Sequence, residues 1–179
     1  DITGYICKST IVPHLFDEAR KQCAVAFEPN AAVWRLLQQN PDRYIYEPVR
    51  RGVIRPDGTE LPETELPDFV QVGMHDPQAR MFDRRYNLGQ ADLQDAEGQR
   101  LTLPTETWRE YVARRTRCLE LRAKLADGDV REINDLVTQN LDLRQFAQDA
   151  IEQCEGPEQL RAFWKSANTM TVLDPTCGS

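Results

Sequence analysis

What the sequence lacks excludes several classes of protein. No stretch approaches the roughly 18 consecutive apolar residues that a membrane-spanning helix needs. The first residues contain no starting methionine and do not follow the basic-then-apolar pattern of a signal peptide. We therefore expect a cytoplasmic protein with no membrane segment, and a chain that was cut from a longer one.

Metal-binding and disulfide patterns are also missing. The chain has five cysteines but no C-x-x-C pair, and neither of its two histidines lies at metal-ligand spacing from a cysteine. An odd number of scattered cysteines fits reduced thiols in the cytosol. The sequence therefore predicts no metal site and no disulfide.

Positive charge is scarce as well. The formal net charge is -7, with 28% charged and 40% hydrophobic residues, a composition typical of a globular domain. Because nonspecific affinity for DNA comes mainly from Lys and Arg, the negative net charge argues against DNA binding by this chain alone.

Apolar residues at helical spacing predict a helical hairpin over residues 1–43. Its first helix runs through Phe16 to Phe27, with Pro13 at a tolerated position in the first turn. Its second helix is capped by Asn30 and stops before Asn40. Between residues 44 and 103, proline and glycine interrupt every apolar run, so we expect an irregular insertion, with short strands at most or partial disorder.

Helical spacing returns over residues 104–168. Thr105 is placed to cap a long helix that Asp127 and Gly128 end, and Asp129 is placed to cap the next short helix. Two further helices follow, one ending near Cys154 and one opening at Pro157. The expected fold class is therefore mainly α.

The last segment, 169–179, changes character. Met170, Val172 and Leu173 indicate a short buried strand, and an acidic residue and a glycine-containing turn follow at once. In doubly wound α/β folds a loop of this kind binds a nucleotide or cofactor, because glycine lets the backbone approach the ligand. On spacing alone, an ordinary strand and turn explains the pattern better.

A family resemblance changes that balance. The sequence Leu-Asp-Pro-Thr-Cys-Gly-Ser at 173–179 resembles the first S-adenosylmethionine (SAM) motif of adenine-specific DNA methyltransferases. Other stretches resemble the BREX PglX-like and combined restriction-modification (type II) methyltransferases of phage defence: Tyr-Ile-Tyr-Glu-Pro-Val-Arg-Arg-Gly-Val at 44–53, and the sequences at 104–115, 133–149 and 154–165. The resemblance is weakest over 55–101.

The resemblance implies the helical N-terminal region of a class I SAM-dependent methyltransferase, ending in the first strand of its Rossmann-like catalytic domain. It implies SAM as the cofactor and transfer of a methyl group to the exocyclic amino group of adenine. Double-stranded DNA, and proteins of a defence system, are the implied partners of the parent enzyme. The implied SAM-binding residues are Asp174, Pro175, Thr176, Cys177 and Gly178.

The chain lacks the family's Asn/Asp-Pro-Pro-Tyr/Phe catalytic motif, so no catalytic residue is assigned and the chain alone is expected to be inactive. Phe146 stands where a second SAM contact often lies, although the Thr-Pro that usually follows is absent and a core role fits better. Cys177 is expected to be a small residue in a tight turn rather than a nucleophile.

Basic residues outnumber the acidic Glu110 and Glu120 on the long helix and could contact phosphates, although a solvated helix face explains them better. They are Arg109, Arg114, Arg115, Arg117, Arg122 and Lys124.

Two other functions stay open: a helical interaction module that uses Trp34, Trp108 and Trp164, and another Rossmann-like nucleotide-binding enzyme.

Overall fold

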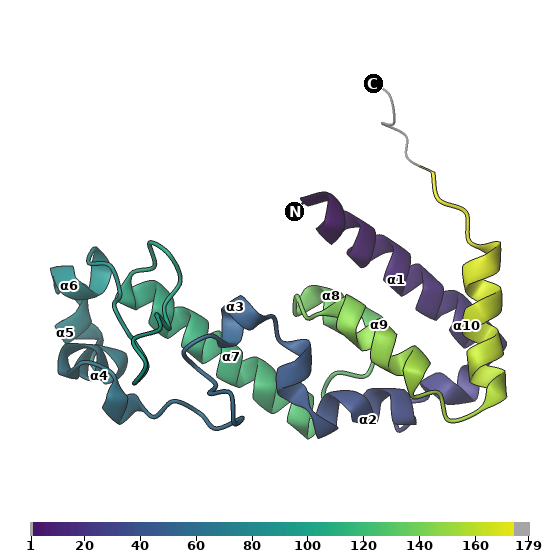
Figure 1. Cartoon of the computed structure of the whole chain (residues 1–179), viewed down its shortest axis with the longest axis horizontal. Helices are drawn as coiled ribbons and strands as arrows, with labels where there is room; N and C mark the ends of the chain where they lie inside the picture. Colours follow the sequence, from purple (N-terminus) through teal and green to yellow (C-terminus); the bar gives the residue numbers. More distant parts are fainter. Residues whose placement is uncertain (1, 174–179) are drawn as a thin grey trace. The chain divides into compact units, whose positions relative to one another are not determined.

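The computed structural model describes residues 2–173, apart from the side chain of Thr3, and this part of the chain is mainly helical (Figure 1). It forms two compact units: unit 1 combines Asp1–Tyr44 with Leu125–Ser179, and unit 2 is Ile45–Lys124. Unit 1 is therefore built from both ends of the chain. Unit 2 contains the segment that the sequence interprets as an irregular insertion.

Unit 1 is a group of helices that surrounds an aromatic core. Its elements are α1 (Ile2–Gln22), η1 (Ala24–Phe27), α2 (Ala32–Gln39), η2 (Pro41–Tyr44), α8 (Ile133–Thr138), α9 (Leu143–Glu152) and α10 (Pro157–Thr169). Phe16 lies at the centre, with ring centroids 5.5 Å from Phe146, 5.1 Å from Phe163 and 5.9 Å from Phe27. Pairs at these separations stabilise by about 0.5–1.5 kcal/mol each beyond the area they bury.

Helix α1 differs from its prediction at both ends. It begins at Ile2, so Pro13 lies inside the helix rather than in its first turn, and it stops at Gln22, with the turn η1 continuing to Phe27. A proline inside a helix removes one backbone hydrogen bond. The burial of Phe16 and Ala19 on the following turns favours the helix in spite of that loss.

The caps of three helices are not the predicted residues. The N-cap of α2 is Ala31, without a side-chain cap hydrogen bond, and not Asn30. Helix α8 is capped by Glu132 and Asp135, which form a reciprocal capping box, and not by Asp129. Helix α7 (Trp108–Asp127) begins beside Thr107, whose backbone N–H donates to the Glu110 carboxylate at 2.8 Å. The hydroxyl of Thr107 in turn accepts the N–H of Glu110 at 3.3 Å, so this pair replaces the predicted cap at Thr105.

Unit 2 is packed around the N-terminal part of α7. Its other elements are α3 (Glu47–Arg50), η3 (Glu63–Glu65), α4 (Asp68–His75), α5 (Pro77–Met81) and α6 (Arg84–Asn87). Three isolated antiparallel bridges join its loops: Ile54 to Glu60, Gln90 to Thr107, and Gln94 to Arg100.

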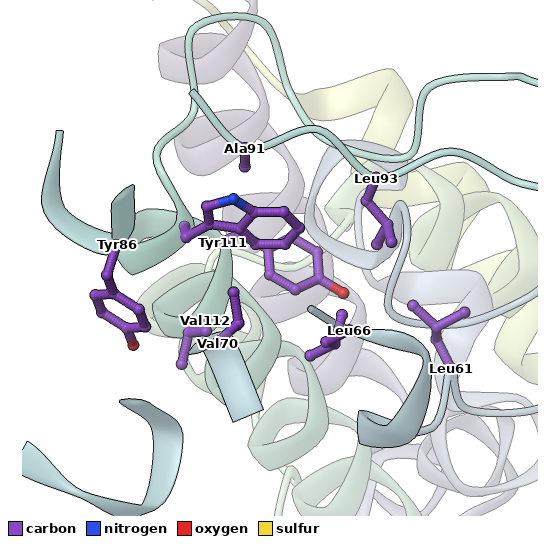
Figure 2. Close-up of a cluster of buried hydrophobic side chains, with 9 residues drawn as sticks. Leu61, Leu66, Val70, Tyr86, Ala91, Leu93, Tyr111 and Val112 are labelled. Carbon is purple, nitrogen blue, oxygen red and sulfur yellow. The ribbon is translucent and has the colours of Figure 1, made fainter. Parts of the chain in front are cut away.

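Figure 2 shows the core of unit 2, in which side chains from the loops and short helices meet those of α7. The buried members are Leu61, Leu66, Val70, Tyr86, Ala91, Leu93, Trp108, Tyr111 and Val112. Residues 45–103 thus form a folded unit together with the long helix. Helices of four to eight residues are too short to show a helical period in the sequence, which is why the pattern predicts loops.

The expected strand at Met170–Leu173 is not assigned as a strand in the described part of the chain. Val172 and Leu173 are exposed there, Leu173 to 87%. A strand needs a neighbour to satisfy its backbone hydrogen bonds, and no segment of the described residues pairs with this one.

Candidate functional site

Helix α10 leads into the predicted SAM-binding turn. Its buried side carries Phe163 and Ser166, and the Ser166 hydroxyl accepts a hydrogen bond from Gln22 Nε2 at 3.1 Å. That contact and the ring of Phe163 fix α10 against α1. The five predicted SAM-binding residues, Asp174, Pro175, Thr176, Cys177 and Gly178, lie outside the described residues.

Phe146, the other candidate SAM contact, is a core residue. Its ring is fully buried and is stacked with the rings of Phe16 and Trp34, at centroid distances of 5.5 Å and 5.7 Å. Tyr44 meets it edge-on at 5.9 Å. Because the Phe146 side chain has no exposed surface, it has no face free to stack on a cofactor.

Asp149 is a buried carboxylate that the sequence does not single out. It accepts hydrogen bonds from Arg43 Nε at 2.5 Å, Arg43 Nη2 at 2.8 Å, the Tyr44 hydroxyl at 2.9 Å and Gln145 Nε2 at 2.9 Å. The Arg43 guanidinium is the main cause that lowers the pKa of Asp149, while burial and the same carboxylate raise the pKa of Tyr44. With both carboxylate oxygens engaged, the group ties η2 to α9 and is a structural element rather than a catalytic one.

The basic cluster of α7 is divided between internal and exposed residues. Arg114 donates to the two carboxylate oxygens of Glu106 at 2.7 Å and 2.9 Å, and both side chains are almost fully buried. Its Nη1 also donates to three carbonyls near the end of α3, including that of Arg51 at 2.6 Å. Arg115 is buried and pairs with Glu60. Arg114 and Arg115 therefore hold unit 2 together and do not face solvent, where phosphates would bind.

No group of three or more His, Cys, Asp or Glu side chains that could hold a metal ion occurs within residues 2–173. His75 instead pairs with Glu63, Nε2 to Oε2, at 2.8 Å.

Among the helices of the described chain, none has the length and apolar character to cross a bilayer.

Each unit carries a hollow large enough for a small ligand. One hollow of unit 1 is an apolar groove of about 470 Å³ against α10, lined by Leu15, Ile151, Leu160 and Trp164 among others. The one in unit 2 has a volume of about 610 Å³ and lies between α3 and the loops around Arg55 and Asp95. Sequence reasoning misses the second hollow, because its walls belong to a segment whose spacing predicts no structure.

Comparison with known proteins adds no relative: no family model, no curated protein and no solved structure matches the chain.

Proposed function

We propose that the chain is the helical region and the first SAM-binding segment of an enzyme that transfers a methyl group from SAM to the exocyclic amino group of adenine in DNA. One observation carries the proposal: the sequence Leu-Asp-Pro-Thr-Cys-Gly-Ser at 173–179 follows directly on an apolar segment with the spacing of a strand. The enzyme acts in phage defence or restriction-modification. The resemblance at 44–53, 104–115, 133–149 and 154–165 supports the same family.

The chemistry of the motif suits the methionine end of SAM. A carboxylate at position 174 can accept hydrogen bonds from an ammonium group, and a glycine at position 178 leaves room for backbone amides to approach the ligand. When bound, SAM supplies a methyl group activated by a positively charged sulfur. The residues of this chain bind and orient that group, whereas the groups that hold adenine are not among them.

The exposed apolar residues around α10 fit a scaffold that packs against the rest of the catalytic domain. Trp164 is 71% exposed and lines the groove of unit 1 together with Leu160. Helix α10 ends at Thr169, and the exposed Val172 and Leu173 follow within a few residues. A sheet built on that segment would lie at the end of α10 and would cover these side chains.

SAM binding tests the proposal. In the polypeptide that continues beyond the motif, Asp174→Ala should abolish binding of SAM in calorimetry. The control Asp129→Ala, at an exposed loop position, should leave it unchanged. Equal affinity of the two variants, or no binding by the parent polypeptide, would overturn the proposal. The chain of residues 1–179 alone should transfer no methyl group to DNA, and transfer by it would contradict the assignment.

The role of α10 has its own test. Trp164→Gln in the longer polypeptide should speed hydrogen exchange both in α10 and in the first strand of the catalytic domain. Arg144→Gln, an exposed site on α9, is the control. If exchange in the catalytic domain does not change, the groove serves another partner, as an interaction module would, and the scaffold role is lost.

A further inference from the structure

A short turn of unit 2 exposes two adjacent apolar side chains. Met81 is the last residue of α5, and Phe82 follows it before α6 begins at Arg84 (Figure 1). The exposed fraction is 83% for Phe82 and 55% for Met81. Because apolar surface is stabilised by removal from water, two such side chains on a rigid segment indicate a surface that a partner covers.

The turn is held in place from inside unit 2. The Asn87 side-chain amide donates to the carbonyl of Arg80 at 2.6 Å and to that of Asp83 at 2.9 Å, so it joins the two ends of the turn. Helix α6 also packs closely on α4, since a Cβ atom built on Gly73 would lie 2.9 Å from the ring of the buried Tyr86. The exposed pair is therefore presented before any partner arrives, which lowers the entropic cost of binding.

The turn also carries positive charge, in a chain whose net charge is -7. The segment 76–90 contains three arginines and two aspartates: Arg80, Arg84, Arg85, Asp76 and Asp83. Both aspartates are engaged as the N-caps of α5 and α6, and Asp83 also pairs with Arg85. On α4, which packs against both helices, the one acidic residue is Asp68, at its first position. Within the described part of the chain, Arg80 and Arg84 form no ion pair, and they lie on either side of the exposed pair.

The size and the composition of this surface favour a nucleic acid over a protein as its partner. A stable protein interface covers about 800 Å² on each partner, whereas a phenylalanine side chain buries only about 150–250 Å². Proteins that kink DNA insert a wedge of one or two apolar side chains, Phe and Met among them, between stacked bases. Arginines beside such a wedge contact phosphates or the groove. The turn has this combination of groups.

We propose that the turn at 80–85 contacts duplex DNA, with Phe82 inserted between stacked bases and with Arg80 and Arg84 facing the flanking phosphates. The inference rests on the proposed function in taking DNA as the partner. It adds a contact that the SAM-binding residues do not supply, and it places that contact in the segment that the methyltransferase resemblance covers least.

Affinity for DNA tests the contact in the polypeptide that contains this chain. Phe82→Ala should weaken binding to a short fluorescent duplex about tenfold, because stacking of the ring on a base is lost. The melting temperature of the protein should stay unchanged, since the ring is exposed. The matched control is Val25→Ala, a 74% exposed apolar residue of unit 1, which should leave the affinity unchanged.

The arginines have a separate readout, the dependence of affinity on salt. Arg84→Gln removes one phosphate contact, so the slope of log K against log salt concentration should fall in magnitude by about 0.9. Arg144→Gln, at an exposed site on α9, should leave the slope unchanged. An unchanged slope in Arg84→Gln would show that this arginine does not face a phosphate and would overturn that part of the proposal.

A tryptophan at the tip of the turn reports its position. Phe82→Trp keeps the stacking, so it should bind DNA as tightly as the parent, and duplex DNA should quench the added fluorescence. Val25→Trp should not be quenched.

Unchanged DNA affinity in Phe82→Ala would overturn the proposal and assign the turn to a protein partner. No DNA binding by the parent, equal quenching of the two tryptophans, or an effect confined to single-stranded DNA would also overturn it. The proposed function fails separately: adenine methylation with Phe82-independent DNA binding refutes only this contact, whereas Phe82-dependent binding without methyl transfer refutes only the enzyme assignment.

Discussion

The Arg43 guanidinium holds the Asp149 carboxylate through two parallel hydrogen bonds, at 2.5 Å and 2.8 Å. The two residues are 106 positions apart in the sequence, and their pairing ties the first part of unit 1 to the second. Tyr44, next in sequence to Arg43, donates to the same carboxylate and also packs on Phe146. This polar network therefore borders the aromatic core.

Removal of the carboxylate should destabilise unit 1. In Asp149→Ala the buried Tyr44 hydroxyl and the Gln145 amide lose their acceptor, so we expect a loss of about 2 kcal/mol in the free energy of unfolding. Urea unfolding measures it. Asp129→Ala, exposed and outside the network, should change the same quantity by less than about 0.5 kcal/mol. Similar values for the two variants would show that the network contributes nothing.

The same carboxylate should make the protein sensitive to acid. Arg43 lowers the pKa of Asp149 below its ordinary value of 3.8, so the folded chain binds this proton less readily than the unfolded chain. The resulting stability is present above about pH 4 and is lost as the pH falls through the folded pKa. The difference in unfolding free energy between the parent and Asp149→Asn should shrink from pH 6 to pH 2. A constant difference would contradict the assignment of the shift.

Arg114 should matter for folding. In Arg114→Met the buried Glu106 carboxylate loses its partner, and breaking a buried pair of this kind costs about 3 kcal/mol. Arg109→Met, at an exposed site one turn earlier, should have little effect. The melting temperatures of the two variants, compared with that of the parent, measure this difference. An Arg114→Met chain as stable as the parent, with weakened binding to DNA in the longer enzyme, would instead restore a phosphate-binding role for this residue.

Substitution of Gly52 and of Gly58 should distinguish the cost of a left-handed backbone conformation from the cost of a steric clash. Gly58 has φ of +81° with no atom within 4 Å of a Cβ built on it, whereas Gly52 combines φ of +65° with a backbone oxygen at 2.6 Å. Gly58→Ala should therefore cost about 1 kcal/mol from the left-handed conformation alone. Gly52→Ala should cost at least about 1 kcal/mol more, since overpacking adds to the strain. Equal losses in denaturant unfolding would show that the Gly52–Leu101 approach relaxes freely.

The sequence predicts the long helices because their period repeats over several turns. The mainly helical class is confirmed, and Gly128 follows directly on the last residue of α7, as expected. The predicted caps are wrong by one to three residues: the N-cap of α2 is Ala31 instead of Asn30, and Thr107 and Glu132 cap the helices for which Thr105 and Asp129 were expected. A cap depends on where the first turn is anchored by packing, which the local sequence does not reveal.

Unit 2 shows what local patterns miss. Its core gathers residues that are distant in the sequence, such as Leu61, Leu93 and Tyr111, and its elements other than α7 are too short for any period. The sequence predicts that Arg114 and Arg115 lie on a solvated helix face, whereas they pair with Glu106 and Glu60 and are buried. Their burial depends on the same packing of distant residues, which a local pattern does not reveal. The SAM-binding residues remain a prediction from resemblance.

The product of the complete enzyme tests the central claim most directly. The polypeptide that contains this chain should be incubated with SAM and unmethylated plasmid DNA, and the digested nucleosides should be separated by mass spectrometry. We expect adenine methylated on its exocyclic nitrogen, produced by the parent and by Asp129→Ala and absent with Asp174→Ala. No methylated nucleoside from the parent, methylation of cytosine alone, or equal product from Asp174→Ala would contradict it.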